Sequence, residues 1–298
     1  MARTIRDLAD RLSGAVVSIG RDWGRGSGVV IDEGWVVTNA HNLRGEEVTV
    51  VFSGGRVEQG RVAGVDVDGD LGVVAVDTRD AAAASWPSEG PEVALGTPVF
   101  ALANPGGRSV RVTYGLVSSL GQAFRGPSGR RIIDAIEHTA PLARGSSGGP
   151  LLNADGRLLG INTHRRGEGF YLAVPTTSEL RRRVEGLTRG ERPRRPRLGI
   201  AVAPPEVASR LRHAVGLPER QGLLVRWVDD NAPAARAGLR TGDLLVAADD
   251  TPVRSSDDLF AVLDQLQEEA SLPLRIVRGS DELSVAVTFG ETREEGAV

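Results

Sequence analysis

Residues 145–150, with the sequence Gly-Ser-Ser-Gly-Gly-Pro, contain the strongest candidate for a nucleophile in this chain. A serine that attacks a carbonyl carbon needs backbone N–H groups directed at the oxygen that becomes negative, and glycines permit the backbone conformation that directs them. Ser147 is a better candidate than Ser146 because it directly precedes Gly-Gly-Pro. Taken alone, the stretch also fits an ordinary Gly/Ser loop. We predict a nucleophile at Ser147 and an oxyanion hole formed by the N–H groups of Gly145 and Ser147.

A general base for this serine is predicted in residues 35–41, a strand-like run that ends in small residues and His41. A neutral imidazole accepts a proton at neutral pH. The chain has 4 histidines, and the others are His138, His164 and His213. A lone histidine is more often structural than catalytic. The position of His41 directly after a strand-like segment favours it over the other three.

An aspartate that orients this imidazole is predicted at Asp70, which opens the apolar run of residues 71–76. Asp66, Asp68 and Asp77 are rivals that by composition alone fit turn carboxylates. Asp70 is favoured because a carboxylate beside an apolar run is easily buried, where it holds one tautomer of the histidine. The chain order His, Asp, Ser is that of chymotrypsin-like proteases and differs from that of subtilisins and α/β-hydrolases.

Further motifs follow one another in an order that resembles the HtrA family of serine proteases with C-terminal PDZ domains. The matching stretches are residues 26–31 (GSGVVI), 37–41 (VTNAH), 70–74 (DLGVV), 103–106 (ANPG), 112–118 (VTYGLVS), 145–152 (GSSGGPLL), 160–163 (GINT) and 171–175 (YLAVP). The resemblance covers nearly the whole chain. It implies that His41, Asp70 and Ser147 form a catalytic triad.

Short strand-like segments with glycine-rich turns follow one another through the first part of the chain and indicate a barrel or sandwich. The predicted strands are residues 15–19, 28–31, 35–38, 48–52, 71–76, 98–102, 113–117, 131–138, 151–152, 158–162 and 170–174. The resemblance implies a chymotrypsin-like double β-barrel, with His41 and Asp70 on the first six-stranded barrel and Ser147 on the second. Residues 1–14 and 176–187 are predicted to be helices.

The domain organisation predicted from the sequence has four parts. The protease domain, with its short N-terminal helix, takes residues 1–187. Residues 188–196 are rich in proline and charge and predict a linker. Residues 197–291 resemble a PDZ domain of the HtrA type, an α+β fold, through residues 232–239 (APAARAGL) and 242–243 (GD). Within them we predict strands at 222–225, 273–277 and 283–289, a turn followed by a strand at 241–246, and helices at 233–237 and 256–267, before a tail at 292–298.

Composition limits the partners and the location. The formal net charge of −3 gives no general attraction to nucleic acid or to anionic membranes, and the linker arginines fit a solvated hinge better than a nucleic-acid site. With 0 cysteines there is no disulfide framework. We predict neither a metal nor a cofactor. No run approaches the ~20 apolar residues of a membrane span and no secretory leader is evident, so a cytoplasmic location is expected, and a periplasmic or membrane-anchored one only if the chain is truncated.

The chain departs from the usual family pattern at several positions around the site. Arg144 replaces a usual proline, Ser146 a usual asparagine, Thr139 a common aspartate, and Asn42 a frequent apolar residue. None of these changes removes a catalytic atom, but Arg144 lies in the loop that shapes the oxyanion hole. Residues 20–26 are too few for the long loop by which some relatives build cages. Aromatic residues that often support trimers are absent before Trp23, so a homotrimer is an expectation from the family alone.

The resemblance implies an ATP-independent serine endopeptidase that cleaves unfolded or misfolded proteins in protein quality control. The alternative is a peptide-binding holdase chaperone whose protease fold is weakly active or inactive. In trypsin-like enzymes an acid six residues before the nucleophile selects Lys or Arg, and Pro141 stands there in this chain. We expect Ile161, Asn162 and Thr163 to form another wall of this S1 pocket, which predicts cleavage after small or medium apolar residues.

PDZ domains of this type bind an extended C-terminal peptide by strand addition. The resemblance implies a carboxylate-binding loop at Leu198, Gly199, Ile200 and Ala201. The helix predicted at residues 256–267 is expected to form the other wall of the groove. Its Leu259 and Leu263 are either peptide contacts or ordinary core residues, and the helical spacing fits both interpretations.

Overall fold

The computed structural model describes residues 2–20, 26–86, 93–191, 196–266 and 270–289. The chain divides into two compact units, residues 1–193 and 194–298. Strands dominate both units, which confirms the mainly β fold class. Part of the predicted linker, the predicted tail and Trp23 lie outside the described residues.

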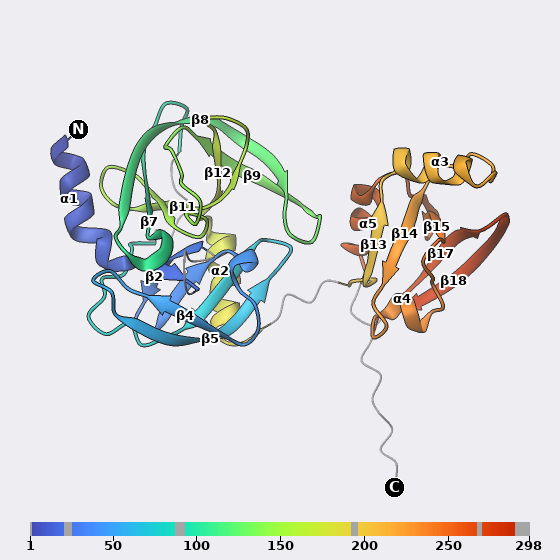
Figure 1. The fold of residues 1–298 in the computed structure, drawn as a ribbon, viewed down its shortest axis with the longest axis horizontal. Coiled ribbons are helices and arrows are strands. Elements are labelled where there is room, and N and C mark those ends of the chain that lie inside the picture. The colour runs from blue at the N-terminus through green and yellow to red at the C-terminus, as the bar shows by residue number, and fades with distance from the viewer. Residues whose placement is uncertain (1, 21–25, 87–92, 192–195, 267–269, 290–298) are drawn as a thin grey trace, which may run out of the picture. The chain divides into compact units, whose positions relative to one another are not determined.

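Six antiparallel strands close into a first barrel in the order β1-β2-β3-β6-β5-β4 (Figure 1). Their bounds are β1 Val16–Ile19, β2 Gly26–Asp32, β3 Trp35–Thr38, β4 Glu47–Val51, β5 Val57–Asp66 and β6 Leu71–Ala75. The sequence did not predict β5. Its fully buried positions are Gly60, Gly64 and Asp66 rather than apolar side chains, so it lacks the pattern of a strand.

A second closed barrel follows in the order β10-β11-β12-β9-β8-β7 (Figure 1). Its strands are β7 Pro98–Ala103, β8 Arg111–Arg125, β9 Arg131–His138, β10 Pro150–Leu152, β11 Leu158–Arg165 and β12 Tyr171–Pro175. The two barrels together confirm the chymotrypsin-like architecture expected from the motifs.

Neighbouring residues of the barrel strands serve two different cores. Val16, Val29 and Val37 belong to a cluster that also contains residues of the second barrel, such as Phe100 and Leu152. The alternate residues Val17, Val30 and Val36 belong to a cluster made of the first barrel alone. Because successive side chains point to opposite faces of a strand, both faces must be apolar here. This explains the continuous apolar runs in the sequence.

Two helices pack against the barrels of this unit. They are α1 Ala2–Leu12 and α2 Ser178–Thr188, with the short 3₁₀ turns η1 Ser13–Ala15, η2 Ala40–Asn42 and η3 Pro105–Gly107. Leu8 of α1 is fully buried in the core shared by the barrels. The hydroxyl oxygen of Thr177 accepts the N–H of Leu180 and caps α2, which packs on β5 and β6. None of the described helices has the length and apolar character that crossing a bilayer requires.

The second unit is a mixed α+β domain built on one antiparallel sheet in the order β13-β14-β15-β17-β18, with β16 beside β15. Its strands are β13 Ile200–Ala203, β14 Leu223–Val228, β15 Leu244–Ala248, β16 Thr251–Pro252, β17 Ser271–Arg278 and β18 Asp281–Thr288. Its helices are α3 Pro205–Ala214, α4 Pro233–Arg236 and α5 Ser256–Leu263. The sequence did not predict α3, because its buried positions are the small Ala208 and the charged Arg212 while its Leu211 is exposed.

Candidate active site

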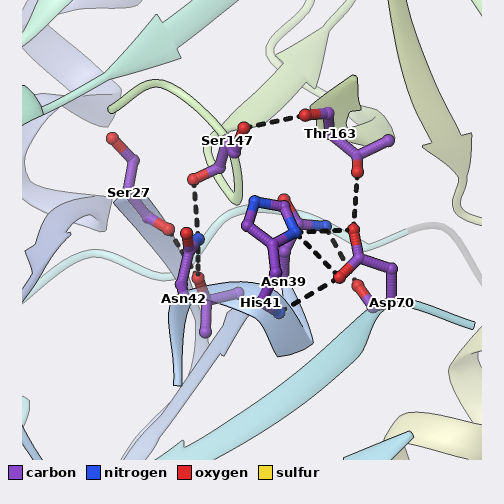
Figure 2. A network of polar contacts seen from close by, with 8 residues as sticks. Ser27, Asn39, His41, Asn42, Asp70, Ser147 and Thr163 are labelled. Carbon is purple, nitrogen blue, oxygen red and sulfur yellow. Dashed lines mark hydrogen bonds and ion pairs between the residues drawn. The ribbon is translucent and has the colours of Figure 1, made fainter. Parts of the chain in front are cut away.

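His41 and Asp70 form a close pair at the first barrel. His41 Nδ1 lies 2.9 Å from each carboxylate oxygen of Asp70 (Figure 2). The Asp70 side chain is 2% exposed, whereas that of His41 is 39% exposed. The backbone N–H of His41 also donates to Asp70 Oδ1 at 3.2 Å. A carboxylate bonded to Nδ1 keeps the proton there and leaves Nε2 as the acceptor, which is the tautomer that a general base needs.

The backbone and carboxylate of Asp70 are both held. Its φ is 51°, in the left-handed region that is uncommon for a residue other than glycine. Asn39 Nδ2 donates to its carbonyl oxygen at 3.0 Å. Thr163 Oγ1, from β11 of the second barrel, donates to Asp70 Oδ2 at 2.7 Å. The carboxylate of the first barrel is therefore anchored to the second, a contact that the sequence did not predict.

The rival aspartates have other partners. Asp66 pairs with Arg183 of α2 at 3.1 Å, Asp68 with the buried Arg130 at 3.2 Å, and the exposed Asp77 with Arg79 at 3.3 Å. Asp70 is thus the one of the four that the structure places against His41.

Ser147 lies in the loop between β9 and β10, on the side of the imidazole that faces away from Asp70 (Figure 2). Its Oγ donates to the carbonyl oxygen of Thr163 at 2.7 Å. A hydroxyl has one hydrogen, so in this conformation it is not donated to His41 Nε2. Rotation about the Cα–Cβ bond to another staggered rotamer redirects the hydroxyl. Catalytic hydrogen bonds often form only when substrate is bound, so the geometry is compatible with a resting nucleophile.

The loop controls one of the two predicted oxyanion donors. The carbonyl oxygen of Ser146 accepts the N–H of Gly149 at 3.1 Å. Since the peptide bond is trans, the N–H of Ser147 points the opposite way. The second donor, the N–H of Gly145, belongs to the Arg144–Gly145 peptide, whose carbonyl has no hydrogen bond within the described part of the chain. Only the first donor is therefore held in place by the loop itself.

In the second unit, Gly199 has a φ of 74°, and a Cβ there would overlap the side chain of Ala232. The carbonyl oxygens of Leu198 and Gly199 accept the N–H groups of Ala234 and Asp229. The N–H groups of Gly199 and Ile200 lie on the opposite sides of those peptide planes.

These two N–H groups lie at the start of β13, which begins at Ile200, pairs with β14 on one edge and pairs with no described strand on the other. Ala201 of β13 is exposed. Such an edge and such donors are what strand addition of a peptide with a free carboxylate requires.

Comparisons with known proteins agree with both units. A model of the trypsin-like peptidase domain matches residues 26–161, and one of the PDZ domain matches residues 196–289. The putative serine protease HhoA of Synechocystis sp. is 33% identical over 283 residues, covering 91% of this chain and 71% of its own. The chain belongs to the HtrA family of serine proteases.

Solved structures are similar over nearly the whole of this HtrA protease. The serine endoprotease from Yersinia pestis has a TM-score of 0.61 at 25% identity, covering 95% of this chain and 96% of its own. The HtrA-type protease AlgW with a tripeptide has a TM-score of 0.58 at 25% identity, covering 95% of each chain.

The residues predicted for the specificity pocket of this HtrA protease differ in how far their side chains are exposed to solvent. Pro141 is exposed, whereas the side chains of Ile161 and Asn162 are fully buried. Ile161 packs in the core shared by the barrels. Any part of the pocket wall that these two residues supply must therefore come from their backbone. Thr163 contributes its hydroxyl to Asp70.

In the PDZ domain, Leu259 and Leu263 of α5 are 4% and 2% exposed and belong to its main core. This placement favours the core interpretation of the two leucines over direct peptide contact. The described residues contain no group of three or more His, Cys, Asp or Glu side chains that fits a metal ion.

Asn162 of β11 holds the loop that carries Ser147 through hydrogen bonds of its backbone and side chain. Its carbonyl oxygen accepts the N–H of Gly148 at 2.7 Å, and its N–H donates to Gly149 O at 2.9 Å. Its side chain donates through Nδ2 to Pro150 O at 3.1 Å and contacts His138 Nε2 through Oδ1 at 3.0 Å. His138 is therefore the donor in this last contact.

Burial lowers the pKa of His138 from 6.5 to about 4, and its hydrogen bond to Asn162 opposes the shift only in part. Its Nδ1 has no hydrogen-bond partner among the described residues, so a second proton would be buried without an acceptor. The folded protein therefore favours the neutral imidazole. The contribution of neutral His138 to the free energy of unfolding is complete above pH 6.5. It is lost as the pH falls toward 4, because the histidine of the unfolded chain takes up a proton at a higher pH than that of the folded chain.

Between pH 7 and pH 4, we expect the free energy of unfolding of the wild-type protease domain to fall by more than that of a His138→Gln variant. The difference between the two should reach up to about 3 kcal/mol. Glutamine keeps an N–H donor for Asn162 and does not titrate. Urea unfolding followed by tryptophan fluorescence measures the difference at each pH. His164→Gln, at an exposed position, is the control and should follow the wild type. An unchanged pH dependence in His138→Gln would contradict the assignment.

Proposed function

We propose that this HtrA protease is an ATP-independent endopeptidase that cleaves unfolded proteins through Ser147, His41 and Asp70. The observation that carries the proposal is the buried Asp70 carboxylate, bonded at 2.9 Å to Nδ1 of a half-exposed His41 whose other nitrogen faces the Ser147 loop. A buried carboxylate behind an accessible imidazole is the arrangement that makes a serine hydroxyl nucleophilic.

In the reaction, His41 Nε2 takes the proton of Ser147 Oγ as that oxygen attacks the peptide carbonyl carbon. Asp70 stays ionised and stabilises the imidazolium. The N–H groups of Gly145 and Ser147 bind the negative oxygen of the tetrahedral intermediate. The imidazolium then gives its proton to the leaving amine, and water activated by the same histidine hydrolyses the acyl-enzyme. None of these steps uses a nucleotide.

The PDZ domain supports a substrate class of unfolded chains. The edge of β13 that pairs with no described strand, and the outward N–H groups of Gly199 and Ile200, suit an extended peptide that ends in a carboxylate. The similar protease AlgW has been solved with a tripeptide, which also supports peptide binding here. Extended segments and accessible C-termini are features of unfolded proteins, so we propose a role in protein quality control.

Two features favour a second candidate, a holdase chaperone with a weakly active protease fold. Ser147 Oγ is bonded to Thr163 O rather than to His41, and the Arg144–Gly145 peptide is not held by a hydrogen bond among the described residues. Both features belong to a site that is not yet aligned. Under this second function the aligned state is rarely reached, and peptide binding is the main activity.

We expect Ser147→Ala or His41→Ala to lower the rate of casein cleavage by at least about 10³-fold, because each removes an essential part of the same unit. Ser146→Ala is the matched control, since it alters the neighbouring hydroxyl and leaves the attacking one; it should keep most of the activity. Cleavage that survives in a contaminant-free Ser147→Ala preparation would disprove the nucleophile. A wild type that fails to cleave but prevents aggregation of a denatured protein would establish the holdase.

The substrate pocket has proline at position 141, where trypsin-like enzymes carry an acid. With no carboxylate from that position to receive a basic side chain, we expect cleavage after small or medium apolar residues such as Val, Ala or Leu. Mass spectrometry of the peptides from a digested unfolded protein identifies the cleavage sites. A majority of cuts after Lys or Arg would contradict this specificity.

We expect this chain with the Ser147→Ala substitution to bind peptides that end in an apolar residue with Kd on the order of 1–100 µM. Amidation of the peptide C-terminus removes the charge that the N–H groups of Gly199 and Ile200 would bind, and should abolish binding. Gly199→Ala should weaken binding similarly, because its Cβ would overlap Ala232. Fluorescence anisotropy measures each affinity. Equal affinity for the free-acid and amidated peptides would show that the domain does not recognise a carboxylate.

A further inference from the structure

Asn42 is the residue next to the proposed base His41, and its side chain bonds to the proposed nucleophile Ser147. It ends η2 directly after His41, and its side chain is fully buried. Its Nδ2 donates to Thr38 Oγ1 and to the carbonyl oxygen of Ser147, both at 3.0 Å (Figure 2). Thr38 belongs to β3 of the first barrel and Ser147 to the second barrel. The amide therefore bridges the barrels at the centre of the site.

The neighbours of this amide determine which of its ends faces them. Thr38 Oγ1 gives its single hydrogen to the carbonyl oxygen of Ser27 at 2.7 Å, so it can only accept from Asn42. The carbonyl oxygen of Ser147 is also an acceptor. Both contacts therefore require the NH₂ end of the side chain, and an oxygen in its place would be repelled by both.

The peptide group that follows the nucleophile is held from both barrels. On one side, the Ser147 carbonyl receives the Asn42 amide and the N–H of Ser27, the latter at 2.7 Å. On the other side, the N–H of Gly148 donates to Asn162 O at 2.7 Å. Rotation of this peptide plane would displace the Cα of Ser147 and, with it, the hydroxyl relative to the imidazole.

Two glycines make room for the amide. A Cβ at Gly26 would overlap the Asn42 side chain. Gly148 has a φ of 89°, and its Cβ would overlap the carbonyl of Ser27 and approach Asn42 Nδ2 to 3.0 Å. The backbone on both sides thus closes around an NH₂ group, which restricts the amide to its present position.

We propose that Asn42 is a positioning residue that sets the geometry between the Ser147 hydroxyl and His41 in the reactive conformation. Its amide bonds to the carbonyl oxygen of Ser147 and belongs to the same 3₁₀ turn as His41, so the backbones of Ser147 and His41 are tied together. The proposal rests on the proposed roles of Ser147 and His41. Misplacement of a reacting group by about 1 Å lowers a rate by about 10²-fold, which sets the scale of the expected effect.

The test uses the full chain with the Asn42→Ala substitution. We expect kcat for a peptide substrate, and the second-order rate of Ser147 labelling by a fluorophosphonate, to fall about 10–100-fold. KM should stay within about threefold of the wild type, because the substitution changes the alignment of Ser147 with His41 and leaves the contacts with substrate unchanged. Asn104→Ala is the matched control: it also removes a fully buried amide, whose Nδ2 donates to Val51 O at 3.4 Å. It should leave the labelling rate within about threefold.

Circular dichroism at the assay temperature establishes that each variant is folded. If Asn42→Ala is not, Asn42→Asp carries the test, since it keeps the shape and replaces the donor by an acceptor, and a loss at least as large is expected. The proposal would be overturned if kcat were unchanged in Asn42→Ala, if the only change were a higher KM, or if the labelling rate fell equally in Asn104→Ala. Labelling that persists in Ser147→Ala would instead contradict the proposed nucleophile, so the two failures are distinct.

Discussion

The site depends on one constraint, the fixed packing of two separately closed barrels against each other. His41 and Asp70 come from the first barrel and Ser147 from the second, so no single barrel contains a complete set. The strands meet this constraint by being apolar on both faces, one for the barrel interior and one for the shared core. Thr163 of the second barrel donates its hydroxyl to Asp70 of the first and accepts the hydroxyl of Ser147 at its carbonyl oxygen. One residue therefore fixes the position of Asp70 relative to Ser147.

Much of this arrangement was predictable because it is encoded locally. The glycine-rich turn at residues 145–150 and the histidine after a strand indicated candidate reacting groups by type and spacing, and the structure places them near each other. Asp70 was favoured over its rivals because its apolar neighbours indicated burial, but the side chains of Asp66 and Asp68 are buried as well, at 1% and 2% exposed. The contact with His41, which the sequence does not show, is what separates Asp70 from them. The strand β5 was not predictable, since glycines and an aspartate occupy its buried positions.

The contacts that complete the site could not be predicted from local patterns. Thr163 and Asp70 are 93 residues apart in the chain, and Asn42 and Ser147 are 105 apart. Such pairs depend on the register of two barrels, which single residue types do not reveal. Leu259 and Leu263 show the same limit, because helical spacing marks an apolar face without saying whether a core or a ligand covers it.

The hydrogen bond from Ser147 to Thr163 affects how often the reactive rotamer is populated, not how fast it is reached. Side-chain rotations take picoseconds to nanoseconds, whereas enzyme turnover takes milliseconds or longer. The serine therefore samples its rotamers many times between reactions, and the resting bond imposes no delay. Its effect is on population instead: a hydrogen bond with a net worth of about 1 kcal/mol reduces the reactive rotamer about fivefold. A displacement of the Thr163 carbonyl away from Ser147 would raise that population.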